Sequence, residues 1–279
     1  MHDTLGLIRK SLKGLRNSEK KVAKCVLSDP EAVVRSSITE LAEKAGTSEP
    51  TVLRFCRRLG LGGYMELRLS LARSLPSSDY IFENVREKDS IAEIAGKILN
   101  AHREAITHTL SRINLDDLEA AASELGQARR IEFYGQGGSA IVARDAYHKF
   151  FRLGIPCIAH DDPHMQVMSA ALLGPGDVVV SISHTGSTKD IIESVQVARK
   201  TGATIIGVLG SENAPLSKIC DIALSVCSRE AALRLAPMTS RLAQLAVLDV
   251  LFVAVAMRDF GATRDRLDKV KMALVGKRY

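Results

Sequence analysis

The strongest constraint on the fold is a regular alternation of short β-rich runs and helical stretches in the second half of the chain. Consecutive runs start roughly 20–25 residues apart, which leaves room for one helix between each pair of strands. This spacing predicts βαβ units and an α/β fold in which helices cover both faces of a doubly wound, five-stranded parallel sheet. The predicted strands are residues 131–134, 155–159, 178–181, 204–209 and 222–226.

The first quarter of the chain has a different pattern, that of consecutive helices joined by short polar segments. Apolar residues recur at helical spacing from Leu5 to Leu15. We expect Asn17 and Ser18 to cap a second helix. That helix should end at Asp29, because the residue before a proline is disfavoured in helical conformation. The sequence therefore predicts an all-α amino-terminal domain.

A stretch rich in proline, serine and charged residues separates the two patterns. We predict an amino-terminal domain over residues 1–77, a linker over 78–90 and a carboxyl-terminal domain over 91–279. The last of these should open with two helices, at 91–113 and 115–128.

The excess positive charge lies entirely in the first quarter of the chain. Residues 1–78 hold 14 Lys and Arg against 8 Asp and Glu, so their net charge of +6 equals that of the whole protein. A small basic domain joined to a neutral larger one indicates binding to a polyanion. The alternative is a basic surface without a partner. An aromatic content of 4% and the absence of Trp argue against stacking on single-stranded bases.

Residues 37–59 have the layout of a helix-turn-helix. Ser37 and Glu40 are spaced as a capping box at the start of the first helix. Gly46 provides the turn, and Ser48 is placed to cap the second helix. In such motifs the second helix enters the major groove of double-stranded DNA.

The second helix of this motif is predicted to have two distinct faces. Val52 and Phe55 lie on an apolar face, while polar and basic side chains occupy the opposite one. A guanidinium group can contact guanine through two bonds or hold a phosphate. The alternative is an αα-hairpin with a solvated basic face. The predicted DNA-binding residues are Ser48, Glu49, Thr51, Arg54, Arg57 and Arg58.

Two loops rich in glycine and hydroxyl side chains follow the first and third predicted strands, at 135–140 and 183–188. Each leads from a parallel strand into a helix, which is where open α/β sheets bind ligands. Glycines let the backbone approach an anion, and hydroxyl and amide groups donate hydrogen bonds to it. This pattern predicts a site for a phosphate monoester formed by Gly137, Gly138, Ser139, Ser183, Thr185, Gly186, Ser187 and Thr188.

Two other interpretations of these loops stay open. Gly135-x-Gly137-x-x-Ala140 matches a loose dinucleotide-binding fingerprint, with Asp161 or Asp162 about 20 residues further on. That interpretation leaves the hydroxyls of the second loop unexplained. The second interpretation is that both loops contain ordinary turn residues and bind nothing.

Seven stretches of the chain carry a resemblance to a known family, residues 41–43, 47–57, 60–64, 135–139, 148–154, 183–188 and 237–242. Both halves together resemble the RpiR family of bacterial transcription regulators, in which a helix-turn-helix precedes a sugar isomerase (SIS) domain. The resemblance implies that a sugar phosphate is held by the hydroxyls of Ser139, Ser183, Thr185 and Thr188, and that SIS domains pair into a homo-oligomer, a dimer or a tetramer.

Within that family the similarity is greatest to repressors of hexose catabolism genes in bacteria that use the Entner–Doudoroff route. The resemblance therefore implies a cytoplasmic repressor of a pseudo-palindromic operator, with 2-keto-3-deoxy-6-phosphogluconate as the effector. Isomerase members of the SIS group use a catalytic base, but no motif marks His160, His164, His184 or Glu193 for that role. We thus expect a pocket without catalysis and without a cofactor. The alternatives are a phosphosugar isomerase with an ancillary helical domain and a regulator that senses a dinucleotide or a hexosamine phosphate.

The cysteine and apolar patterns argue against a metal-binding protein and against a membrane-spanning one. The five cysteines are scattered and show no CxxC or Cys/His spacing, so the sequence predicts no metal site and favours a reducing cytoplasm. The longest apolar run, residues 242–257, has 16 residues and includes Gln244 and Asp249. We judge it too short and too polar to cross a bilayer, and predict a core or interface helix.

Overall fold

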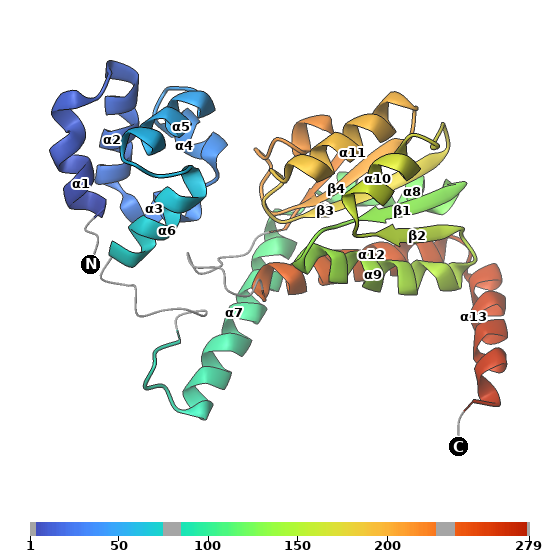
Figure 1. The fold of residues 1–279 in the computed structure, drawn as a ribbon. Coiled ribbons are helices and arrows are strands. Elements are labelled where there is room, and N and C mark those ends of the chain that lie inside the picture. Colours follow the sequence, from blue (N-terminus) through green and yellow to red (C-terminus); the bar gives the residue numbers. More distant parts are fainter. Residues whose placement is uncertain (1–3, 75–84, 227–237, 278–279) are drawn as a thin grey trace. The chain divides into compact units, whose positions relative to one another are not determined.

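The computed structural model describes residues 4–74, 85–226 and 238–277 (Figure 1). The chain divides into two compact units. The first is Met1–Ala101 with Glu230–Pro237, and the second is His102–Arg229 with Met238–Tyr279. The predicted linker lies partly outside the described residues, because these resume at residue 85.

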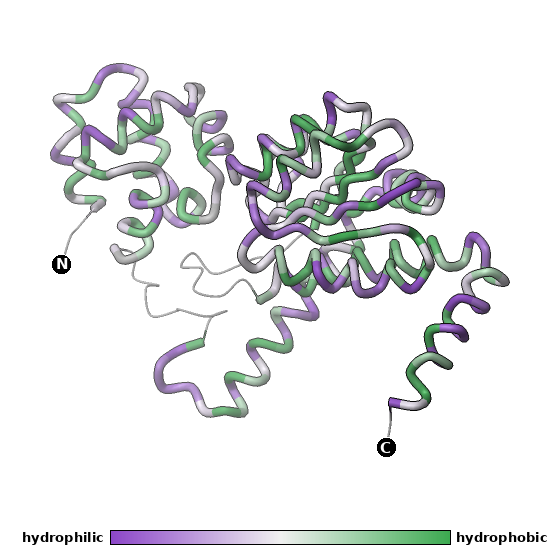
Figure 2. Tube along the Cα trace, turned by 45° about the vertical axis from the view of Figure 1, so that its right-hand side comes forward, coloured by the Kyte–Doolittle hydropathy of each residue, from purple (hydrophilic) through white to green (hydrophobic). Residues whose placement is uncertain are grey.

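The first unit is built from short amphipathic helices around one apolar core. Hydrophilic and hydrophobic residues alternate along them (Figure 2), and their apolar faces form a single buried cluster. The all-α prediction is confirmed. The elements are α1 (Thr4–Ser11), η1 (Leu12–Gly14), α2 (Asn17–Ser28), α3 (Pro30–Arg35), α4 (Ile38–Lys44), α5 (Glu49–Arg58) and α6 (Tyr64–Ser74).

The start of α2 differs from the prediction. The N-cap residue is Arg16, whose backbone N–H donates to the Glu19 carboxylate at 3.0 Å. Asn17 and Ser18 lie within the first turn, so the prediction that they cap the helix was wrong. The Glu19 carboxylate three residues into the helix satisfies the first free donor, and a side-chain cap from Asn17 or Ser18 is not needed.

The helix α3 was not predicted. Pro30 does end α2, but it also occupies the first position of α3, where a missing N–H costs nothing. The Asp29 side chain caps this helix by accepting a hydrogen bond from the Ala32 N–H at 2.9 Å. The dipeptide Asp29-Pro30 therefore ends α2 and begins α3.

The second unit contains the predicted five-stranded parallel sheet. Its strand order is β2-β1-β3-β4-β5, and every neighbouring pair is parallel. This confirms the doubly wound α/β fold. The strands are β1 (Arg130–Tyr134), β2 (Cys157–His160), β3 (Asp177–Ser183), β4 (Thr204–Leu209) and β5 (Ile222–Ser225).

Helices cover both faces of this sheet (Figure 1). Helices α8, α9 and α12 pack in the core on one face, and α10 and α11 pack in the core on the other. Helix α7 (Ile91–Arg112) contributes residues to both units. The other helices are α8 (Leu115–Gln127), α9 (Gly138–Phe150), α10 (Pro163–Ala170), α11 (Lys189–Lys200), α12 (Thr239–Arg258) and α13 (Phe260–Val275), with short turns η2 (Phe151–Leu153) and η3 (Ser217–Ile219).

Helix α12 contains the long apolar run. It spans 20 residues, longer than the predicted run, and it is the one helix within the described ranges that is long and apolar enough to cross a bilayer. The length argument against a membrane span was therefore wrong. Its buried side chains, including Val247 and Leu251, pack in the sheet core with α8 and α9. The core helix of a globular unit passes the same test, and this packing supports that explanation.

Candidate nucleic-acid interface and ligand loops

Helices α4 and α5 form the predicted helix-turn-helix. The capping box is present, since Ser37 Oγ accepts from the Glu40 N–H at 3.1 Å and the Glu40 carboxylate accepts from the Ser37 N–H at 2.7 Å. Gly46 has φ +58°, a left-handed conformation that suits glycine at a helix end. The Gly46 N–H donates to Glu43 and the Thr47 N–H to Ala42, both at 2.9 Å. These bonds end α4 and turn the chain into α5.

Helix α5 presents one buried face and one exposed face. Val52, Phe55 and Cys56 are fully buried in the core of the first unit. Burial raises the pKa of the Cys56 thiol to about 12, so this side chain behaves as an apolar one. The guanidinium-bearing residues Arg54, Arg57 and Arg58 are exposed. An anchored helix with an exposed basic face is the arrangement that groove binding requires.

Thr51 departs from the prediction that placed it on the outward face. It is only 3% exposed, because α5 packs against α2, α4 and α6, and these together cover more of the helix than one apolar stripe. Its hydroxyl accepts a hydrogen bond from Arg54 Nη2 at 2.7 Å and lies 3.1 Å from Ser48 Oγ. Thr51 is therefore placed to hold Arg54 rather than to reach a base.

Ser48 and Glu49, the first two residues of the predicted interface, differ in exposure and in their contacts. Ser48 is exposed and is the N-cap residue of α5, although its side chain makes no capping bond. Glu49 is half-buried, and its carboxylate accepts a hydrogen bond from Thr39 Oγ1 at 2.6 Å. Glu49 thus ties α5 to α4.

The two predicted ligand loops follow adjacent strands. Strands β1 and β3 are paired in register, with Tyr134 opposite Ser181. From β1 the chain crosses to β2 on one side, and from β3 it crosses to β4 on the other, so strand order reverses between them. In doubly wound sheets this switch point is where ligands bind, outside the carboxyl ends of the strands.

The first loop is folded tightly against the start of α9. A Cβ on Gly135 would lie 2.5 Å from the Ser139 carbonyl oxygen, so only glycine allows this approach. Gly137 has φ +55° and is the N-cap residue of α9. The Ser139 N–H donates to the Gln136 carbonyl at 3.1 Å. The loop therefore brings the start of α9, with its dipole, to the end of β1.

The second loop is held by its own hydroxyls and by a later segment of the chain. Ser183 is buried, and its Oγ accepts a hydrogen bond from the Gly186 N–H at 3.1 Å. Gly186 has φ +56°, and a Cβ there would lie 2.4 Å from the Ala214 Cβ. The Gly186 carbonyl accepts from the Leu216 N–H at 2.9 Å. Residues that follow β4 thus fix the shape of this loop.

The predicted ligand residues differ in their exposure. Thr188 is the N-cap residue of α11, and its side chain makes no capping bond. Thr185 Oγ1 accepts from the Ser187 N–H at 3.4 Å. Gly137 and Ser187 are exposed, Gly138, Ser139, Thr185 and Thr188 are half-buried, and Ser183 and Gly186 are buried.

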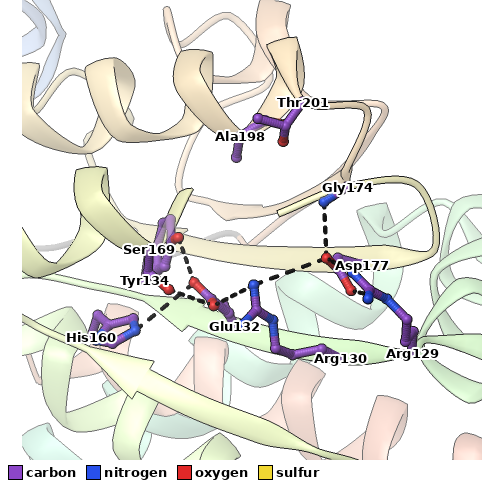
Figure 3. Close-up of polar contacts among 10 residues, drawn as sticks. All are labelled: Arg129, Arg130, Glu132, Tyr134, His160, Ser169, Gly174, Asp177, Ala198 and Thr201. Carbon is purple, nitrogen blue, oxygen red and sulfur yellow. Dashed lines mark hydrogen bonds and ion pairs between the residues drawn. The ribbon is translucent and has the colours of Figure 1, made fainter. Parts of the chain in front are cut away.

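Of the four residues considered as a base, His160 is held in a buried polar network between the sheet and α10 (Figure 3). Its Nε2 lies 3.9 Å from the carboxylate of Glu132, which is fully buried. That carboxylate accepts hydrogen bonds from Tyr134 at 2.6 Å and from Ser169 at 2.7 Å. Burial and this bond to a carboxylate raise the pKa of the Tyr134 hydroxyl, which keeps the donor protonated. The network links β1, β2 and α10.

The other three residues considered as a base lie on different elements. His164 is exposed on α10. Glu193 is exposed on α11 and pairs with Lys189 at 3.5 Å. His184 lies against the segment after β4, because a Cβ on Gly210 would be 2.6 Å from its Nδ1. None of these positions singles out a general base.

Gln166 is a supporting residue that the sequence did not reveal. It is fully buried on α10, and its Nε2 donates to the carbonyls of Gly135 at 3.3 Å and His160 at 2.8 Å. These bonds fix the first residue of the first loop. A single glutamine within a helical stretch carries no signal of this role, because its acceptors lie on two separate strand ends.

Comparisons with known proteins cover both units. Residues 2–78 match the helix-turn-helix domain of the rpiR family, and residues 124–254 match the SIS domain family. The chain is 40% identical over 273 residues to the HTH-type transcriptional regulator HexR of Escherichia coli K12, covering 98% of this chain and 94% of that one. The chain belongs to the RpiR family. It is thus an HTH-type transcriptional regulator with a SIS domain.

Two further similarities extend this result. An uncharacterized HTH-type transcriptional regulator of Caldanaerobacter subterraneus is 41% identical over 261 residues, which are 93% of each chain. The structure of Vibrio vulnificus NanR complexed with ManNAc-6P aligns with a TM-score of 0.87 at 25% identity, covering 99% of each chain. Residues 135–140 lie within the range that matches the SIS domain family.

Proposed function

We propose that this RpiR-family protein represses carbohydrate catabolism genes and leaves its operator when a phosphorylated sugar acid binds between the two loops. One observation carries the proposal: glycine- and hydroxyl-rich loops flank the switch point of the sheet in a chain that also exposes an arginine face on α5. The resemblance to repressors of hexose catabolism genes implies 2-keto-3-deoxy-6-phosphogluconate as the effector. The NanR complex with ManNAc-6P supports a phosphorylated sugar as the ligand class.

The phosphate would be held by groups from both loops. The starts of α9 and α11 supply backbone N–H groups and the positive ends of two helix dipoles. Thr188 supplies a hydroxyl that its helix does not use. Ser183 accepts a bond from Gly186 and can still donate its own hydrogen to an anion. Neutral donors bind the phosphate without requiring a buried cation.

The operator would be read by α5. Arg54 is held by Thr51 before DNA arrives, so less side-chain entropy is lost on contact with a base. A homodimer would present two copies of α5 to a pseudo-palindromic site, with half-sites about 34–36 Å apart or a multiple of that distance. We infer that the protein acts in the cytoplasm, where a bacterial operator lies.

The proposal is tested with Ser139→Ala and Ser183→Ala in the full-length protein. Each change removes a hydrogen bond to a charged group, worth roughly 1.5–3 kcal/mol, so effector affinity should fall about 10- to 100-fold. Operator binding without effector should persist, because α5 lies in the other unit. Each variant should then stay on DNA at effector concentrations that release the wild type. Ser123→Ala, on α8 outside both loops, is the matched control.

Two outcomes would contradict the proposal. Release of both variants at the wild-type effector concentration would place the pocket elsewhere. Loss of operator binding without effector in both variants would make the loops structural.

A thermal-shift panel of sugar-acid phosphates, hexosamine phosphates and dinucleotides identifies the effector, because a ligand of the folded state raises stability. Turnover of ketose or aldose phosphates would instead support the isomerase alternative.

A further inference from the structure

An open depression on the first unit is lined by Arg16, Glu19, Arg54, Arg57 and Arg58. Arg54, Arg57 and Arg58 share the exposed face of α5 at helical spacing. Arg16 comes from a different element, the N-cap position of α2, which packs against α5. The DNA-binding residues predicted from the sequence all lie between Ser48 and Arg58, so the prediction did not include Arg16.

The lining carries an uncompensated positive charge. Four guanidinium groups face one carboxylate, a net of three positive charges. Glu19 is 2% exposed, and its carboxylate accepts the Arg16 backbone N–H, so it is already committed to the start of α2. None of the four guanidinium groups forms an ion pair with another residue that the structure describes. Arg129 and Arg258, in the other unit, pair with Asp177 and Glu119.

An anion would relieve the repulsion between these charges. The planar guanidinium fork matches the oxygens of a phosphate and binds it through two hydrogen bonds. Base edges are met by the early residues of such a helix, whereas Arg57 and Arg58 lie in the last turn of α5. The anion beside a DNA-reading helix is the sugar-phosphate backbone. The chemistry therefore favours a phosphodiester as the occupant of the depression.

We propose that Arg16, together with Arg57 and Arg58, clamps one backbone phosphate next to the bases that Arg54 contacts. The clamp extends the interface from α5 to the start of α2. It rests on the proposed DNA-binding function and adds a residue and a ligand class to it. A phosphate contact is independent of sequence, so the clamp contributes equally to operator and non-specific binding.

The test compares Arg16→Ala with Lys21→Ala in the full-length protein. Lys21 is exposed on α2 and does not line the depression, so both variants lose one positive charge from the same part of the first unit. Binding is measured against a duplex selected from a random library by the wild type and against its scrambled sequence, over a series of salt concentrations. Arg16→Ala should weaken binding to both duplexes by the same factor, about ten-fold at fixed salt.

The salt dependence identifies the contact. The slope of log K against log salt should become shallower by about 0.9 for each phosphate contact that is lost. Arg16→Lys keeps the charge and should retain the wild-type slope, whereas Arg16→Gln should behave as Arg16→Ala. The thermal unfolding midpoint without DNA should stay unchanged, because the Arg16 side chain is exposed and its backbone bond to Glu19 remains.

Three results would overturn the clamp. Arg16→Ala could match Lys21→Ala on both duplexes, which would make Arg16 one solvated charge among others. A loss confined to the selected duplex would make Arg16 a base contact. If neither Arg16→Gln nor Arg16→Ala changes the salt slope while the wild type binds DNA, the clamp fails and the proposed function stands. A wild type that selects no duplex refutes the proposed function itself.

Discussion

Replacing Gly186 with alanine should disable the effector site while leaving operator binding intact. Gly186 has φ +56°, and an added Cβ would lie 2.4 Å from the Ala214 Cβ, closer than two such atoms can approach. The second loop must therefore move away from the segment that follows β4. That movement breaks the bond between the Gly186 N–H and Ser183 Oγ, which shapes the loop.

The size of the effect follows from these contacts. A left-handed conformation costs a non-glycine residue roughly 1–2 kcal/mol, and a lost hydrogen bond costs about 0.5–1.5 kcal/mol. The loop relaxes when no ligand is bound, and the effector must restore the strained shape in order to bind. Gly186→Ala should therefore reduce effector affinity roughly 10- to 300-fold.

A second substitution separates steric overlap from backbone strain. Ala214→Gly removes the atom that the new Cβ would meet, and the next contact, to the Leu216 Cβ at 3.6 Å, is an ordinary one. The double variant should recover part of the lost affinity and retain only the strain of positive φ. Gly174→Ala, where an added Cβ meets nothing within 4 Å, is the control and should bind effector normally.

The assay is the release of a labelled operator duplex by increasing effector, followed by fluorescence anisotropy. Thermal unfolding without effector checks that each variant is folded. Wild-type release by a folded Gly186→Ala protein would show that the second loop does not take part in effector binding. No recovery in the double variant would show that overlap with Ala214 is not the cause of the loss.

Three further substitutions test other parts of the structure. Arg54→Ala should cost about 1–3 kcal/mol in operator binding and less in non-specific binding, measured by anisotropy, and equal losses on both would exclude base reading by Arg54. Gln166→Leu removes the bonds to the Gly135 and His160 carbonyls and should weaken effector binding about ten-fold in calorimetry, whereas unchanged affinity would mean that the first loop needs no support from α10. Glu40→Ala breaks the capping box of α4 and should lower the free energy of unfolding of the first unit by about 0.5–2 kcal/mol in urea, whereas an unchanged value would show that the Glu40 carboxylate does not stabilise the start of α4.

The strands could be predicted from the sequence because buried parallel strands are short apolar runs with helices between them. Their ends were less visible. Strand β3 was predicted over residues 178–181 but extends to Ser183. The prediction stopped at Ser181, where the continuous apolar run ends, although Ile182 and Ser183 are buried as well. The strand thus runs directly into the ligand loop, and this continuity fixes the position of Ser183.

The faces of α5 could be predicted only in part. The apolar stripe was correct, but helical periodicity does not show how many neighbours a helix has. Thr51 is buried because α2, α4 and α6 all contact α5. Arg16 was not predicted for a related reason, since only the packing of α2 against α5 brings it beside Arg57 and Arg58.

The buried network around Glu132 includes a contact that a sequence pattern cannot predict. A carboxylate inside a strand is costly unless partners satisfy it. One partner, Tyr134, lies two residues away on the same strand face, which the sequence could indicate. The other hydrogen-bonding partner, Ser169, comes from α10, 37 residues further along the chain. Arg130, two residues earlier on the same strand, also pairs with this carboxylate at 3.5 Å, but only the packing of α10 on the sheet reveals the hydrogen bond from Ser169.

The chemistry of the loops also limits how well the site can discriminate one sugar phosphate from another. Hydroxyl and amide donors recognise the phosphate, which every sugar phosphate carries, so they do not distinguish one sugar from another. A sugar acid adds a carboxylate, and removing that charge from water is costly unless a cation or several donors receive it. A preference of ten-fold or more for the sugar acid phosphate over the same sugar phosphate without the carboxylate therefore requires about 1.4 kcal/mol from a group that contacts the carboxylate. Equal affinity for the two would mean that the site reads the phosphate and the sugar hydroxyls alone.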